Sequence, residues 1–308
     1  MPRTDDSTSV VGRAGEGVAN GTLGELVQGQ TVAGEDFLVT FPVAFWSRAR
    51  AVINDAGIVI GPSQKSKARR MASLVLQRLG LPNAGAVLEI ECGVPEGKGC
   101  ASSTADVVAT ARAICDATGL SLEPGEVGEL AVEIEPSDGV MWDGVVAFNH
   151  RAGRLLRHLG KLPPLRLVAF DLGGHVDTVQ FNRRPKDYSP AERRHCQEAL
   201  DQIAAAIDRG DVQLLGEACT LSARIHQRIL PKPELPELIR IVQTTGGCGV
   251  NIAHSGTVVG LIYPVDRADE AERGRSMVLE RFPKFERLTV EPLSGSEHMK
   301  VEKTNARK

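Results

Sequence analysis

The sequence predicts an α+β fold in two lobes, and three observations support this fold class. The chain has 308 residues, a length typical of about two domains. Strand-type and helix-type patterns are mixed in both halves of the chain. A Pro163-Pro164 pair between the halves is the best candidate for a boundary. We therefore expect an N-terminal lobe over residues 18–162, a C-terminal lobe over residues 163–296, and flexible ends at 1–17 and 297–308.

In the first half, β-type runs are followed by helices. The stretches "FLVTFPVAFW" and "RARAVIND" are rich in strand-forming residues, and "AVLEIECG" alternates as a half-buried strand does. A helix is expected over residues 64–79, because Gly80 and Pro82 follow it. One further helical pattern begins near Ser103, and another covers residues 126–132. The stretch "GVVAFNH" is typical of a strand.

The second half repeats this mixture. "LRLVAFDLG" has the composition of a buried strand, and helical patterns cover residues 191–208, 212–227 and 234–244. "VNIAHSGTVVGLIYP" predicts two strands joined by a tight turn. A last helix over 271–282 and a last strand over 285–293 complete the lobe.

The composition is that of an ordinary globular protein, with 42% hydrophobic and 24% charged residues. A net charge of -3 gives no general attraction to nucleic acid or to an anionic membrane. No apolar run approaches the roughly 20 residues that span a bilayer, and the N-terminal stretch lacks the apolar segment of a signal peptide. Six cysteines without a CxxC pair indicate reduced thiols in a cytoplasmic protein.

The stretch "VPEGKGCASSTADVVATARAI" contains the most informative motif of the chain. Apolar residues recur with helical spacing from Val107 onward, and Ser102 or Ser103 suits the N-cap position. A helix start preceded by small residues offers backbone N–H groups to an anion such as a phosphate. Neither the Walker pattern nor the Rossmann fingerprint is present. The alternative is a glycine-containing turn that only caps a core helix.

Residues 95–105 match a known motif more closely than a generic loop does. They resemble the GHMP kinase signature P-x-G-x-G-L-G-S-S-A-A, with departures at Cys100, Ala101 and Thr104. The form "KGxASSTAD" is similar to the L-threonine kinase branch of that family. "GTLGELVQG", "IEPSDGVMWDGVVAFNHR", "GGHVDTVQFNR" and "VNIAHSGTVVGL" resemble further segments of the branch, although Asn20 and Asn149 replace its more usual proline and aspartate.

These resemblances follow the family order over roughly residues 18–265 and imply a two-lobe GHMP kinase fold. The implied N-terminal lobe is a ribosomal-protein-like α/β sandwich, and the implied C-terminal lobe is ferredoxin-like. ATP and the substrate would lie in the cleft between them, with Mg²⁺ as the metal. The implied nucleotide-binding residues are Pro95, Gly97, Lys98, Gly99, Cys100, Ala101, Ser102, Ser103 and Thr104. Lys98 would also assist catalysis, unless it is a solvated charge.

Magnesium prefers hard oxygen ligands, which directs attention to hydroxyl and carboxylate side chains near the loop. Ser103 is the favoured hydroxyl, with Ser102 as the alternative. Glu135 is favoured over Glu133 because the Pro136 break places it beside the loop. Asp106 is a further candidate, although an acidic residue near a helix start is also explained by the helix dipole.

The resemblance implies that Asp138 accepts or orients the proton of the substrate hydroxyl. An Asx-turn role is the alternative for this residue, since Ser-Asp-Gly is common in turns. The family pocket implies that Glu25 receives an α-ammonium group. The remaining implied pocket residues come from the second lobe: Asp177, Thr178, Asn182 and Arg183.

The implied activity is transfer of the ATP γ-phosphate to the hydroxyl of a small amino acid. L-threonine, giving O-phospho-L-threonine, is the expected acceptor. Serine, homoserine or another hydroxylated amino acid is an alternative acceptor, and a catalytically silent nucleotide-binding regulator is the rival class. The expected partner is the small-molecule substrate, without nucleic acid or membrane, and a homodimer is left open.

Overall fold

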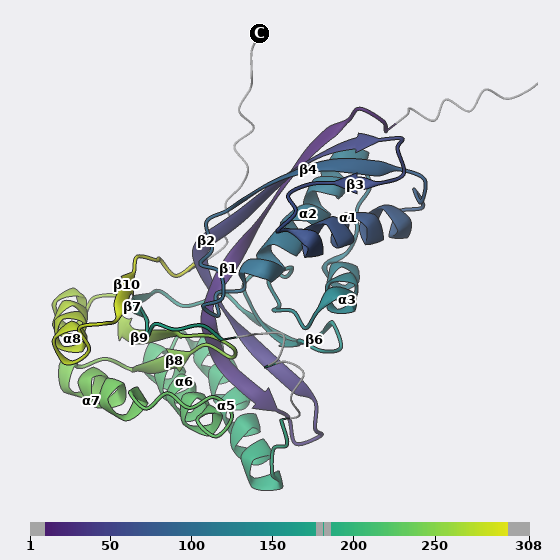
Figure 1. Cartoon of the computed structure of the whole chain (residues 1–308). Helices are drawn as coiled ribbons and strands as arrows, with labels where there is room; N and C mark the ends of the chain where they lie inside the picture. The colour runs from purple at the N-terminus through teal and green to yellow at the C-terminus, as the bar shows by residue number, and fades with distance from the viewer. Residues whose placement is uncertain (1–9, 177–180, 182–185, 295–308) are drawn as a thin grey trace, which may run out of the picture.

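The computed structural model describes residues 10–176, 181 and 186–294. Strands of both halves form one ten-stranded sheet, with helices packed on it (Figure 1). The strands are β1 (Ala14–Gln30), β2 (Asp36–Asn54), β3 (Val59–Ile60), β4 (Gly85–Cys92), β5 (Val145–Asn149), β6 (Arg154–Gly160), β7 (Leu165–Asp171), β8 (Gly249–Ile252), β9 (Val258–Pro264) and β10 (Glu286–Leu288). The helices are α1 (Ser66–Arg78), α2 (Ser102–Thr118), α3 (Pro124–Ile134), α5 (Pro190–Arg209), α6 (Val212–His226), α7 (Leu235–Thr245) and α8 (Ala268–Arg281).

The sheet connects the two halves of the chain through one strand pair. Its order is β10-β7-β9-β8-β1-β2-β4-β3, with β5 and β6 branching from β2. Strands β1 and β8 pair antiparallel at Glu25 and Ile252. Glu25 is therefore placed where the strands of the first half meet those of the second.

Strands β1 and β2 form a long antiparallel hairpin that runs past helices of both halves (Figure 1). The two expected strands over 37–46 and 48–55 are one continuous strand, β2. Strand β1 was not expected, and because it begins at Ala14, residues 14–17 are ordered strand rather than part of a flexible end.

Helix α2 lies directly against β1, and two glycines permit this approach. A Cβ on Gly15 would lie 2.1 Å from Ala117 N, and one on Gly17 would lie 2.2 Å from Ala109 O. Both distances are far shorter than a normal van der Waals contact, so any larger residue at Gly15 or Gly17 would push α2 away from β1. The glycines that weaken the strand signal in the sequence thus position the helix that starts at Ser102.

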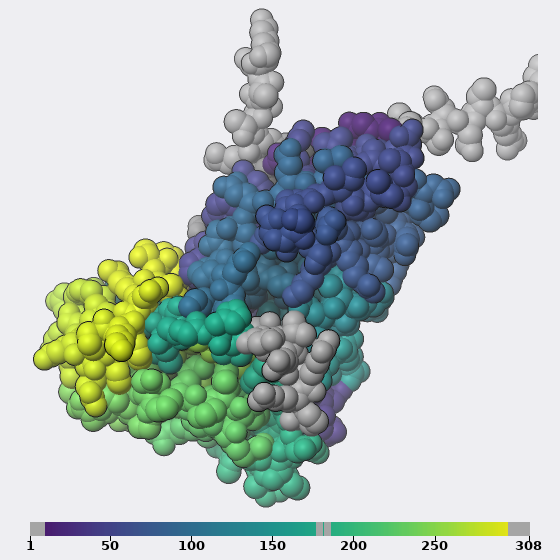
Figure 2. All heavy atoms as spheres, viewed as in Figure 1, coloured from purple at the N-terminus to yellow at the C-terminus, as the bar shows by residue number. Residues whose placement is uncertain are grey.

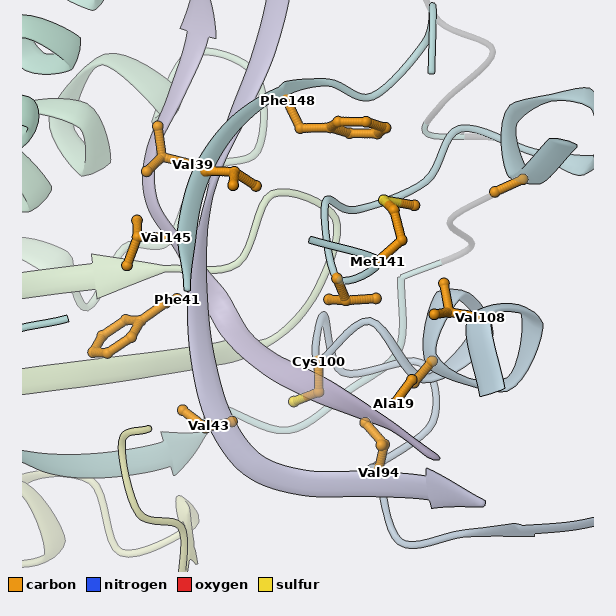
Figure 3. Packing of buried hydrophobic residues seen from close by; sticks show 14 of the residues in the cluster. Ala19, Val39, Phe41, Val43, Val94, Cys100, Val108, Met141, Val145 and Phe148 are labelled. Carbon is orange, nitrogen blue, oxygen red and sulfur yellow. The ribbon is translucent and has the colours of Figure 1, made fainter. Parts of the chain in front are cut away.

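Two apolar clusters form the core. The larger one joins β1, β2, β5 and α2 and continues into α5 and α6 of the second half. Figure 3 shows Cys100 within it, near Val94 and Ala19, so this loop residue is anchored by its side chain. The smaller cluster lies between α7, α8 and strands β7–β9.

Figure 2 shows the purple-to-blue first half at upper right and the green-to-yellow second half at lower left. Both halves contain strands and helices, as the α+β prediction requires, whereas the boundary at 162/163 stays a prediction. All six cysteines are free, as expected for reduced thiols. Among the described helices, none is both long and apolar enough to cross a bilayer.

Candidate active site

The N-terminus of α2 presents backbone donors without acceptors. The first intrahelical bond runs from Ala105 N to Ala101 O, so the amides of Ser102, Ser103 and Thr104 have no acceptor within the helix. No side chain of the described residues caps this end. The expectation of a serine N-cap is wrong: the N-cap is Ala101, in the left-handed conformation with φ 61°. A helix end left open in this way is suited to an anion.

The loop before α2 is fixed by backbone hydrogen bonds to both halves. Lys98 O accepts from Thr257 N at 2.9 Å and from Val258 N at 3.1 Å, which joins the loop to the β8–β9 turn. Gly99 O accepts from Gly24 N at 3.0 Å, which joins it to β1. The loop is therefore rigidly held before any ligand arrives.

Gly256 explains the close approach of the β8–β9 turn to the loop. A Cβ at Gly256 would lie 2.1 Å from Lys98 O and 2.4 Å from Gly99 N. The absence of a side chain at this glycine therefore permits the packing of the turn against the loop. Gly97 and Gly99 adopt positive φ angles of 71° and 87°, which glycine tolerates without strain.

A cavity of about 580 Å³ opens in front of the helix end. Its walls come from the loop and the start of α2, the start of α1, the segment 135–138, and single residues of other elements. Seven predicted nucleotide-binding residues line it: Gly97, Gly99, Cys100, Ala101, Ser102, Ser103 and Thr104. Pro95 and Lys98 lie outside its lining.

Two carboxyl groups face each other in this cavity. Glu25 and Asp138 are both buried and share a hydrogen bond. Burial, followed by the charge of Asp138, raises the pKa of Glu25 well above its ordinary value. Burial also raises the pKa of Asp138, while the hydrogen bonds from Glu25 and Thr104 act against the rise. Two neighbouring carboxyl groups whose pKa values are both raised resist being ionised together.

Thr104 positions Asp138 from the first turn of α2. Thr104 Oγ1 donates to Asp138 Oδ2 at 3.3 Å, and Asp138 N donates back to Thr104 Oγ1 at 3.3 Å. The structure thus brings the predicted acceptor-site residues Glu25 and Asp138 beside the predicted nucleotide loop. A hydroxyl group entering the cavity would meet a carboxylate next to an anion-binding helix end.

Ser103, Glu135 and Lys67 form a chain at the same helix end. Ser103 Oγ donates to Glu135 Oε1, and Lys67 Nζ pairs with Glu135 Oε2 at 2.6 Å. The predicted metal candidates Ser103 and Glu135 are therefore adjacent. Their hydroxyl and carboxylate oxygens are of the kind that Mg²⁺ prefers.

Asp106 is engaged elsewhere. Ser47 Oγ donates to Asp106 Oδ1 at 2.5 Å, and Lys65 Nζ pairs with Asp106 Oδ2 at 2.7 Å. Both carboxylate oxygens thus have partners inside the protein, and the predicted metal role of Asp106 stays a prediction. Asp106 holds Lys65 at the rim of the cavity, where Lys65 also pairs with Glu96 at 2.6 Å.

Lys98 points toward the second half of the chain. Its Nζ pairs with Asp171 Oδ2 at 2.6 Å and donates to Gly174 O at 3.1 Å. Burial raises the pKa of Asp171, but its hydrogen bonds lower this pKa by more than burial raises it. The hydrogen bond from Lys98 contributes most, and the pKa of Asp171 lies below its ordinary value. The arrangement ties the loop to the end of β7, and the predicted catalytic and phosphate roles of Lys98 stay predictions.

Some predicted residues lie outside the described part of the chain, namely Asp177, Thr178, Asn182 and Arg183. Other cavity residues were not predicted from the sequence. Lys65 and Lys67 lie at the start of α1, and His150 follows β5. The basic run "QKSKARR" at the start of a predicted helix was the available signal for the two lysines.

Comparisons with known proteins agree with this geometry. The family model "GHMP kinases N terminal domain" matches residues 66–148, and "GHMP kinases C terminal" matches residues 203–284. An L-threonine kinase of Citrobacter freundii is 31% identical over 252 residues, covering 80% of this chain and 86% of that protein. An L-threonine kinase of Salmonella typhimurium is 32% identical over 254 residues, covering 81% and 83%.

Solved structures show the same fold. The homoserine kinase of Cytophaga hutchinsonii aligns with a TM-score of 0.69 at 16% identity, covering 95% of this chain and 98% of that one. A match at this identity establishes the architecture, and the family models and the two relatives establish the membership. The chain belongs to the GHMP kinase family, and the family models together with the two L-threonine kinase relatives support an ATP-dependent kinase that acts on a hydroxyl group.

Proposed function

We propose that this chain transfers the γ-phosphoryl group of ATP to the side-chain hydroxyl of L-threonine, giving O-phospho-L-threonine and ADP. The observation that carries the proposal is the Glu25–Asp138 carboxyl pair beside the open N-terminus of α2. The names of the Citrobacter freundii and Salmonella typhimurium relatives support threonine as the acceptor.

The helix end is assigned to the ATP phosphates. The amides of Ser102, Ser103 and Thr104, together with the positive end of the α2 dipole, favour an anion here. Lys65 and Lys67 add positive charge at the rim of the same cavity. Transfer of a phosphoryl group needs charge neutralisation and alignment more than covalent help from the protein.

Magnesium fits the oxygen atoms of Ser103 and Glu135, which already contact one another. Bound there, the ion would neutralise phosphate charge. No cluster of three metal-binding side chains occurs among the described residues, as expected for an ion that takes its other ligands from phosphates and water. Lys67 balances the Glu135 charge and orients its carboxylate.

Asp138 is assigned to the acceptor hydroxyl. As the substrate oxygen forms its bond to the γ-phosphorus, the hydroxyl proton passes to the Asp138 carboxylate and the bond to ADP breaks. We assign the substrate ammonium to the Glu25–Asp138 pair, because a carboxylate of this pair can accept its N–H bonds. Both assignments place the amino acid deeper in the cavity than the phosphates.

A coupled ADP-release assay with L-threonine, L-serine and L-homoserine tests the proposal. We expect threonine to give the highest kcat/KM, with O-phospho-L-threonine identified as the product by phosphorus NMR. A higher kcat/KM for serine or homoserine would overturn threonine as the acceptor. ATP binding without turnover of any hydroxyamino acid would overturn the kinase assignment in favour of the silent regulator.

A further inference from the structure

Three imidazoles and one lysine are packed together at one wall of the cavity. His150 and His254, which both line the cavity, have ring centroids 5.2 Å apart, and His226 lies 5.3 Å from His254. Lys186 Nζ lies 2.9 Å from His254 Nε2 and 4.2 Å from the centre of the Phe181 ring. All these side chains are buried, and the proposed phosphoryl transfer uses none of them.

The hydrogen bonds define which nitrogen carries each proton. Gln28 Nε2 donates to Ile252 O at 3.5 Å, which leaves Gln28 Oε1 as the acceptor for His254 Nδ1 at 2.6 Å. His254 Nε2 is then unprotonated and accepts from Lys186 Nζ. His254 thereby holds the Lys186 amine in a fixed place, with two of its three N–H bonds left for other acceptors.

Lys186 is buried, and the charge of Asp36 acts on its amine from beyond ion-pair distance. Within residues 10–176, 181 and 186–294, no carboxylate lies within ion-pair distance of its Nζ. Burial, reinforced by the charge of Arg151, lowers the pKa of Lys186 to about 8. Placing a positive charge in such a site is costly unless an anion compensates it.

His150 is a buried side chain with unpaired polar atoms in the described structure. Neither of its ring nitrogens has a hydrogen-bond partner within the described structure, although the side chain is buried. Burial lowers the pKa of His150 to about 3, so the ring is neutral and offers one N–H donor. Buried polar groups of this kind are seldom left unpaired, and those that are require an explanation.

His150 lines the cavity that also holds the Glu25–Asp138 pair, and Lys186 lies beside this cavity against the lining residue His254. The carboxyl pair can bind a cation, whereas Lys186 and His150 offer N–H donors to an anion. Ser137 N donates to His150 O at 3.0 Å, which holds His150 beside the segment that carries Asp138. An α-amino acid presents a matching ammonium and carboxylate on one carbon atom.

We propose that Lys186 and His150 form the binding subsite for the α-carboxylate of the acceptor, an inference that rests on the proposed amino acid kinase activity. His254 acts as a positioning residue that aims the Lys186 amine. The subsite makes the carboxylate a requirement for good acceptors. Hydroxylated amines without a carboxylate would fit the phosphoryl-transfer geometry but leave both donors unpaired.

The test compares L-threonine with L-threonine amide, in which the carboxylate is neutral and the other groups are unchanged. For the wild-type protein we expect kcat/KM to favour threonine by about 10- to 100-fold, the value of a charge-assisted hydrogen bond. Lys186→Met should remove most of this preference by raising KM for threonine, with little change for the amide. ATP affinity and the thermal unfolding midpoint, measured in parallel, report whether the variant is folded.

Lys232→Met is the matched control, because Lys232 is also a buried lysine but donates to Gly256 O at 2.8 Å. Any effect of this variant should fall on both substrates alike and leave their ratio unchanged. Equal kcat/KM values of the wild type for threonine and its amide, or a folded Lys186→Met variant with the wild-type ratio, would overturn the subsite. Absence of turnover of every amino acid by the wild type would instead remove the proposed function itself.

Discussion

Replacing Asp138 by asparagine separates proton acceptance from every other property of the site. Asparagine has nearly the same shape and can keep the contacts with Thr104, which at 3.3 Å are long and contribute little to stability. It removes the carboxylate that is assigned to the acceptor hydroxyl. A positioned general base typically contributes about 100- to 10,000-fold, so we expect kcat to fall by this factor.

Nucleotide binding should survive the same change. The phosphates are assigned to the backbone amides of Ser102, Ser103 and Thr104, none of which is altered. The assay is steady-state ADP release with saturating threonine, together with calorimetric titration of an ATP analogue. Asp143→Asn, which removes an exposed carboxylate outside the cavity lining, is the matched control and should leave both measurements unchanged. Turnover within tenfold of the wild type in Asp138→Asn would refute the assignment of Asp138 as the base.

Three further predictions concern pH, the loop and the helix start. Because burial raises the pKa of Asp138 and the base must be ionised, kcat/KM should fall as the pH drops through a value above the ordinary 3.8, and a pH–rate profile that stays flat down to 4 would contradict this. Gly256→Ala should weaken ATP binding and lower the free energy of unfolding by about 1–3 kcal/mol, because its Cβ would lie 2.1 Å from Lys98 O. The control in the same denaturation and titration experiments is Gly93→Ala, whose Cβ would lie 3.5 Å from its nearest neighbour, Trp46 O. Ala101→Gly should raise the free energy of unfolding by about 1 kcal/mol by relieving the left-handed φ of 61°, and an unchanged or lower value in urea denaturation would count against strain at this position.

The helices could be predicted because their apolar residues follow the helical period. The expected range 64–79 corresponds to α1, Ser66–Arg78, and the range 212–227 corresponds to α6, Val212–His226. Strand β1 was missed for a physical reason. It is buried along nearly its whole length and contains glycines that let α2 approach, so it shows neither alternation nor strand-type composition.

The contents of the site were only partly predictable. The loop, Glu25 and Asp138 were each implied by the motifs that resemble the family, because these motifs are short stretches of sequence. The pairing of Glu25 with Asp138 was not predicted, since it depends on how distant segments pack. The partners of Asp106 and Lys98 were not predicted either, since Ser47 and Asp171 are brought to them by the pairing of distant strands.

Lys186 and His150 illustrate the same limit. Lys186 lies outside the quoted motifs, and His150 lies at the end of one of them without a role implied by it, so the sequence does not assign either residue to the site. Only the packing of the His254 turn against the Asp138 segment gives these two side chains a shared role.

The most direct test of the account is a crystal structure of the chain with a non-hydrolysable ATP analogue and L-threonine. The account predicts the terminal phosphate within hydrogen-bond distance of the Ser102, Ser103 and Thr104 amides, and the threonine hydroxyl between that phosphate and Asp138. A nucleotide bound away from the start of α2, or a threonine hydroxyl remote from Asp138, would contradict it.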